Sequence, residues 1–227
     1  MHTSPALLTI HILLLVAWLG IDVGVLTSSF VMRRPNMSTE TRLTVRGLMR
    51  NLDMAPRISL ILMIPVALLL TRSTGWGLAD VSEGLLWLVA VVAIVWAVFS
   101  VVSFRATGPT GSSSAWAAGF AKLDSWLRAA ASVFFIVTGM ASLTGSGIWG
   151  ADWIAWKATL FGTIIAMGLW IRVAAKAYHP ALAELLEKGE SPGRLAAVNQ
   201  KIRGVYPPVL LIWGSLVVMV ILAMFRP

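Results

Sequence analysis

The sequence predicts an all-α integral membrane protein, a bundle of six transmembrane helices in one domain over residues 1–227. Hydrophobic residues make up 58% of the 227 residues and charged residues only 12%, and the mean hydropathy is +0.82. In a soluble domain about a quarter of the residues are charged. The chain also holds six apolar runs near the length of about 20 residues that a helix needs to cross a bilayer.

The predicted spans, in chain order, are residues 6–32, 53–71, 84–104, 125–143, 153–173 and 205–225. The second and fifth have the shortest uncharged stretches, about 14 residues or about 21 Å of helix, so we expect their end charges to lie at the membrane interface. Between the fifth and sixth spans, residues 180–203 predict a cytoplasmic helical hairpin, broken by the sequence GESPG.

The basic residues indicate an orientation. Fifteen of the 18 Lys and Arg residues lie on one side of the predicted bundle, mostly in residues 33–57 and 172–203. By the positive-inside rule that side is cytoplasmic, so both termini lie outside the cytoplasm and the protein is a multi-pass inner-membrane protein. Since topology accounts for the net charge of +8, we expect no nucleic-acid partner. The basic loops favour contact with lipid headgroups over a protein partner, and a homo-oligomer remains open.

The absence of cysteine from the sequence excludes disulfides, thiolate-bound iron–sulfur clusters, Cys-bound zinc and covalently attached haem. The sequence has no P-loop and no HExxH motif, so nucleotide hydrolysis and zinc proteolysis lack the residues that would carry them.

Ionisable residues at membrane depth are costly and indicate function. On a helix at about 100° per residue, His11, Trp18 and Asp22 share one face of the first span, and we expect that face to point into the bundle. A histidine at this depth has three uses: haem iron ligation, a proton relay or a hydrogen bond between helices. The candidates for a second iron ligand are Met63, Met140, Met219, Lys157 and His11 of a second copy.

Lys157 has two interpretations, an interfacial lysine beside tryptophans or a cation that neutralises a haem propionate, in which Arg72 would assist. Asp22 and Arg128 lie at similar predicted depth, so we expect a structural ion pair between them. Asp124 is four residues before Arg128 and is the alternative partner. Asp53 and Arg57, also four apart, predict an interfacial pair.

Two apolar runs resemble a known family. The run "HILLLVAWLG" in the first span and "WIAWKATLFGTIIAMGLWIR" in the fifth are similar to the small membrane haem proteins that comprise the HemJ-type protoporphyrinogen oxidases and the copper-resistance D-type (CopD) domains. The likeness lies in a first-span histidine before W-[LM]-G and a lysine that opens a later span. It implies that His11 is a haem b ligand and that Lys157 belongs to the haem pocket.

From the residues and this resemblance together, we expect a haem b-binding membrane protein. It would transfer electrons between the quinone pool and a partner or substrate, with a HemJ-like oxidation as one version. A haem-free transporter lined by Asp22, Arg128 and Lys157 is the first alternative. A scaffold subunit of a larger membrane complex, docked through the basic hairpin, is the second.

Overall fold

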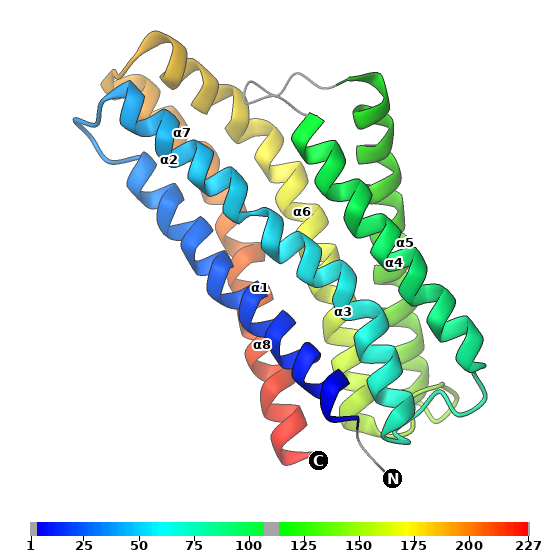
Figure 1. Cartoon of the computed structure of the whole chain (residues 1–227). Helices are drawn as coiled ribbons and strands as arrows, with labels where there is room; N and C mark the ends of the chain where they lie inside the picture. The colour runs from blue at the N-terminus through cyan, green and yellow to red at the C-terminus, as the bar shows by residue number, and fades with distance from the viewer. Residues whose placement is uncertain (1–3, 107–113, 227) are drawn as a thin grey trace.

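The computed structural model describes residues 4–106 and 114–226 (Figure 1). Six helical segments in it are long and apolar enough to cross a membrane, which confirms the predicted all-α membrane fold. The elements are α1 Pro5–Met32, α2 Thr39–Leu52, α3 Met54–Ser73, α4 Glu83–Ala106, α5 Ala115–Leu143, α6 Asp152–Lys188, α7 Pro192–Ile202, the short 3-10 helix η1 Arg203–Val205 and α8 Tyr206–Phe225.

Two helices extend well beyond their predicted spans. α5 begins at Ala115, ten residues before the predicted start of the fourth span, and α6 continues to Lys188 instead of ending near residue 173. With 37 residues, α6 is about 55 Å long at 1.5 Å per residue. Hydropathy did not predict the two extensions as parts of the spans, because they lie outside the most apolar stretches. An amphipathic helix needs only one buried apolar face, so its hydropathy is too low to identify it as a span.

Both helical arms of the predicted hairpin over residues 180–203 are present, with the break at GESPG, but the first arm is the end of α6 and not a separate helix. α6 runs through Pro180 without a break and ends at Lys188, and the next residue, Gly189, has a φ of +74°, which suits glycine. A proline inside a helix removes one backbone hydrogen bond. Packing outweighs that cost here, because Leu182 and Leu185 continue the buried face of α6 and pack with Val198 of α7.

The α7 end of the molecule, which we call the hairpin end, has a small apolar core of its own. Its buried members come from α1, α6 and α7 and include Met32, Tyr178 and Ile202. Arg42 of α2 is almost fully buried there and donates to the carbonyls of Met32, at 2.6 Å, and of Arg34, at 3.0 Å. It also pairs with Glu190. Arg42 therefore ties α1, α2 and the α6–α7 turn together rather than facing lipid headgroups.

The closest helix pair is α5 and α6. A Cβ added to Gly139 would lie 2.8 Å from the carbonyl oxygen of Ala155, and one added to Gly162 would lie 2.7 Å from that of Ser132. Ser132 Oγ donates to the Gly162 carbonyl at 2.7 Å. Small residues at these positions let the two backbones approach, as is typical of membrane helices.

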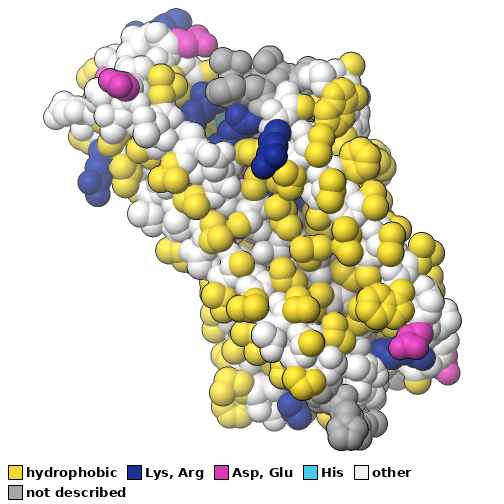
Figure 2. All heavy atoms as spheres, in the orientation of Figure 1, with side chains coloured by type: hydrophobic (Ala, Val, Ile, Leu, Met, Phe, Trp, Pro, Cys, Tyr) yellow, Lys and Arg dark blue, Asp and Glu magenta, His cyan; other side chains and the backbone are white. Residues whose placement is uncertain are grey.

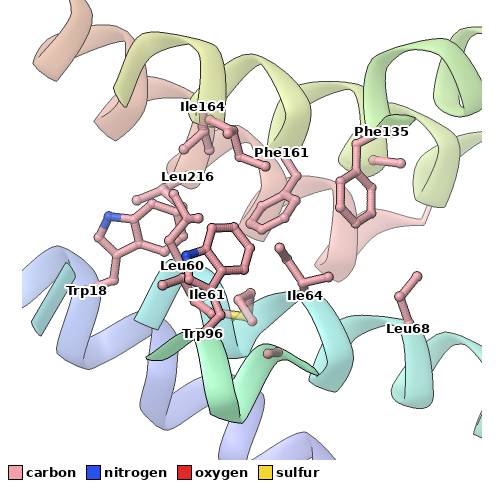
Figure 3. Close-up of a cluster of buried hydrophobic side chains, with 14 of the residues drawn as sticks. Trp18, Leu60, Ile61, Ile64, Leu68, Trp96, Phe135, Phe161, Ile164 and Leu216 are labelled. Carbon is pink, nitrogen blue, oxygen red and sulfur yellow. The ribbon is translucent and has the colours of Figure 1, made fainter. Parts of the chain in front are cut away.

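The main apolar core lies between α1, α3, α4, α5, α6 and α8 (Figure 3). Trp18 is 4% exposed and stands edge-on to Phe161, with ring centroids 6.4 Å apart. Large hydrophobic side chains also cover the outside of the bundle (Figure 2). An outer surface of this kind is consistent with a lipid bilayer around the helices.

The order of the helices decides which side chains can meet. In Figure 1, α1 and α5 lie on opposite sides of the bundle, with α3 and α6 between them. The first and last helices begin and end at the opposite end from α7, which we call the termini end. The α3–α4 and α5–α6 loops meet there through an isolated antiparallel bridge between Gly77 and Trp149.

Candidate functional site

His11 lies near the termini end of α1 and is partly buried. Its Nδ1 is fully buried, and neither ring nitrogen makes a hydrogen bond within residues 4–106 and 114–226. Buried polar atoms almost always have a partner, so an unengaged imidazole requires an explanation. The predicted placement of His11 on the same inward side as Trp18 agrees with the burial of both side chains.

Lys157 lies at the same end, on the second turn of α6. Its Nζ is 5.5 Å from the centre of the Trp153 ring, and the guanidinium of Arg226 lies 5.8 Å from the same ring. In the described part of the chain, neither cation has a carboxylate partner. Trp153 is 8% exposed and its Nε1 is buried without an acceptor. Among the described residues, the termini end therefore holds two cations without a carboxylate partner and two buried ring nitrogens without a hydrogen bond, His11 Nδ1 and Trp153 Nε1.

An apolar groove begins one turn along α1 from His11. It has a volume of about 160 Å³ and separates α1 from α8. The groove contains no charged lining residue and is formed by Leu15, Leu19, Leu216, Val217, Val220 and Ile221. A flat apolar group bound at His11 would find its hydrophobic surface here.

Arg72, a further residue predicted for the haem site, has contacts of its own. Arg72 donates to the carbonyls of Leu78, at 2.7 Å, and of Ala79, at 3.0 Å, and also to that of Val81. Through Nη1 it therefore holds the α3–α4 loop, whose carbonyls lack helix partners, and its role at a propionate stays a prediction.

Three methionines were predicted as candidate sulfur ligands. Met219 of α8 is partly buried against the core, and the other two differ in place. Met140 is 48% exposed on α5, across the bundle from α1, so it cannot reach iron held by His11 in the same protomer (Figure 1). Met63 is 5% exposed and belongs to the same core cluster as Trp18. Its thioether packs among apolar side chains, which is the common role of methionine in a core.

The predicted ion pair between Asp22 and Arg128 is wrong. Asp22 Oδ2 accepts a hydrogen bond from Trp213 Nε1 of α8 at 2.7 Å. Arg128 pairs with Asp124 of its own helix, the alternative that the sequence offered, with Nε 3.2 Å from Oδ2. The reason is the order of the helices, since α1 and α5 lie on opposite sides of the bundle and equal depth does not bring them together.

Asp124 is the centre of a buried network that the sequence did not reveal in full. Besides Arg128, it accepts from Trp96 Nε1 of α4 at 2.7 Å and from Arg172 Nη2 of α6 at 2.5 Å. Three helices are thereby joined at one carboxylate that is 6% exposed. The available signal was Trp96, because an indole N–H inside an apolar span needs an acceptor.

An arginine-rich cavity of about 230 Å³ adjoins this network toward the hairpin end. Arg50, Arg57, Arg128 and Arg172 line it, with Asp124 as the lining carboxylate. Arg57 pairs with Asp53, as predicted, with Nε 2.7 Å from Oδ2. The apolar part of the lining comes from Met54, Phe104, Ala117, Phe120 and Ala121.

Within the described residues, no three His, Asp or Glu side chains are grouped as a metal site. A single imidazole with unengaged nitrogens is instead the arrangement that can supply one axial ligand to haem iron. No protein-family model matches the chain, and comparisons with curated proteins and with solved structures find no significant similarity.

Proposed function

We propose that this protein binds haem b through His11 and transfers electrons between the membrane quinone pool and a partner or substrate. The observation that carries the proposal is the imidazole of His11, which is buried at Nδ1 and makes no hydrogen bond in the described part of the chain. Neutral imidazole is a common ligand of haem iron. Haem b, when bound, would supply one-electron redox chemistry.

The residues around His11 suit the chemistry of the group. Haem carries two propionates, and Lys157 and Arg226 are two cations without a carboxylate partner at the same end of the bundle. Charge-assisted hydrogen bonds from such cations orient a carboxylate. Trp153 would keep both cations in place through its ring, and its buried Nε1 is a further donor.

The size of the apolar groove limits how the group is held. Pockets that enclose a whole ligand measure about 300–1,000 Å³, and the groove between α1 and α8 measures about 160 Å³. The groove would therefore cover only part of the group. The chain's own contribution would be to ligate through His11, to bind the carboxylates and to keep water away with Leu15 and Leu216.

The proposal also includes the orientation of the protein in the membrane. Most of the Lys and Arg residues lie toward the hairpin end, which by the positive-inside rule faces the cytoplasm in an inner membrane. His11 would then lie near the outer surface.

The first test is the absorbance spectrum of the purified full-length protein, oxidised and reduced with dithionite. We expect a Soret band and a sharp α-band on reduction, both lost in His11→Ala. His179→Ala is the matched control, since His179 is exposed near the hairpin end, and it should keep both bands. Wild-type protein that stays colourless after expression with ample haem would reject the proposal and leave the haem-free alternatives, a transporter or a scaffold subunit.

A further inference from the structure

The arginine-rich cavity near the hairpin end is separate from the proposed haem site. It is lined from α2, α3, α4, α5 and α6, whereas His11 lies on α1 at the termini end. Its electrostatics are unbalanced. Four guanidinium groups line it. Three of them, those of Arg57, Arg128 and Arg172, share the two carboxylates of Asp53 and Asp124. Among these three one positive charge is in excess, at a depth where charge is costly unless it is matched.

Two residues of the cavity, Arg128 and Ser100, have donors without an acceptor among the described residues. Arg128 is 5% exposed, and only its Nε is used in a hydrogen bond within the described residues. Its two terminal nitrogens remain for a ligand. Ser100 also lines the cavity, and its Oγ is buried without a partner in the described part of the chain. Guanidinium and hydroxyl donors that converge on one space with excess positive charge are typical of a phosphate site.

The rest of the lining is apolar and points to the source of the phosphate. Phe104 and Phe120 face the cavity, and Phe120 stacks on Phe99 with ring centroids 5.8 Å apart. Outside the cavity, Phe99 and Val102 of α4 and Leu123 of α5 are about half exposed on the lipid-facing surface. A phosphate held by the arginines would thus have an acyl-chain path beside it. Basic pockets between helices are known to bind anionic headgroups in this way.

We propose that this cavity binds a phosphate group, carried by an anionic phospholipid whose acyl chains lie along α4 and α5. The arginines contact the phosphate oxygens, and the Ser100 hydroxyl donates to one of them. The carboxylate of Asp124, already bonded to two arginines and Trp96, holds the donors in place.

The test is lipid binding to the full chain in detergent, followed by native mass spectrometry. Phosphatidylglycerol is the probe, and phosphatidylcholine is the comparison because its choline cation opposes the arginines. We expect wild type to bind phosphatidylglycerol about tenfold more tightly, the equivalent of one charge-assisted hydrogen bond. Equal binding of the two lipids would overturn the proposal.

Two variants act on the cavity in different ways. Ser100→Leu fills it and leaves every arginine in place, and Arg50→Gln removes one lining charge. Each should weaken phosphatidylglycerol binding about tenfold. Arg105→Gln is the matched control, since Arg105 is exposed at the same end of α4 and does not line the cavity. If Arg105→Gln weakens binding as much as Arg50→Gln, the effect is general surface charge and the cavity is rejected. Circular dichroism checks folding, and Arg50→Gln decides if Ser100→Leu misfolds.

Inorganic phosphate, with chloride at equal ionic strength as the comparison, distinguishes the two sources. Displacement of phosphatidylglycerol by millimolar phosphate, but not by chloride, supports a site that also accepts free phosphate. Retention of the lipid in phosphate, together with weaker binding in the two variants, supports the lipid as the ligand. Displacement by chloride and phosphate alike would show that no phosphate is recognised.

Discussion

Ser132 of α5 donates a hydrogen bond to the backbone carbonyl of Gly162 on α6, at 2.7 Å. This contact forms only because position 162 has no side chain. A Cβ added at position 162 would lie 2.7 Å from the backbone oxygen of Ser132 on α5. It would lie equally close, 2.7 Å, to Cγ1 of Ile136 on the same helix. The α5–α6 interface is therefore set by backbone approach rather than by large apolar side chains.

Gly162→Ala should destabilise the protein by about 1–3 kcal/mol, the usual cost of forcing a methyl group into a packed interface. Gly168→Ala on the same helix should have the opposite sign, because a Cβ there meets nothing within 4 Å and alanine favours helix by about 0.5–1 kcal/mol. Thermal unfolding in detergent compares the two. Equal shifts in the same direction would contradict the close approach of the backbones.

Asp124→Asn should destabilise the bundle by about 3–5 kcal/mol, because it leaves buried Arg128 and the partly buried Arg172 without their carboxylate. Asp53→Asn is the matched control. Its pair with Arg57 is exposed and should contribute about 0–1 kcal/mol. Denaturant titration followed by circular dichroism measures both, and similar losses would mean that the Asp124 network is no more stabilising than a surface pair.

Trp213→Phe removes the donor to Asp22 and keeps an aromatic ring. We expect a loss of about 1–3 kcal/mol, the cost of a polar group left without its hydrogen bond. Trp170→Phe is the control, since Trp170 is 47% exposed, and it should change stability by less than about 0.5 kcal/mol. The double variant Asp22→Asn with Trp213→Phe should cost less than the sum of its parts.

The orientation can be checked by single-cysteine labelling, because the native sequence has no cysteine. Ser146→Cys places a thiol in the α5–α6 loop at the termini end, and Glu187→Cys places one on an exposed position near the hairpin end. In intact spheroplasts a membrane-impermeant maleimide should label Ser146→Cys and not Glu187→Cys. The reverse pattern would invert the proposed topology.

Lys157→Gln tests the electrostatics of the proposed haem site. A cation near the iron favours the reduced form, so its removal should lower the midpoint potential while the Soret band is kept. Lys176→Gln, an exposed change toward the hairpin end, should leave the potential unchanged. A redox titration compares both with wild type, and an unaltered potential in Lys157→Gln would place that lysine outside the site.

The six spans could be predicted because they depend on length and hydropathy alone. The local pairs Asp53–Arg57 and Asp124–Arg128 were also visible, since residues four apart on a helix are neighbours wherever the helix lies. The contacts of Asp22, of Arg172 and of Arg72 were not. These contacts depend on the order and rotation of the helices or on the course of a loop. The sequence of an apolar span gives almost no indication of which of its faces packs against which neighbouring helix. The continuity of α6 through Pro180 was not predicted for a related reason. Proline disfavours a helix locally, but the packing of α6 against α7 outweighs that effect.

The hydrogen bond between Asp22 and Trp213 also has a consequence for the order in which the protein is synthesised and assembled. The two residues are 191 positions apart in the chain, and ribosomes add about 5–20 residues per second. The first helix is therefore made roughly 10–40 s before its indole partner exists. During that interval Asp22 must be protonated, hydrated or held by another protein, and the bundle closes only when its last helix enters the membrane.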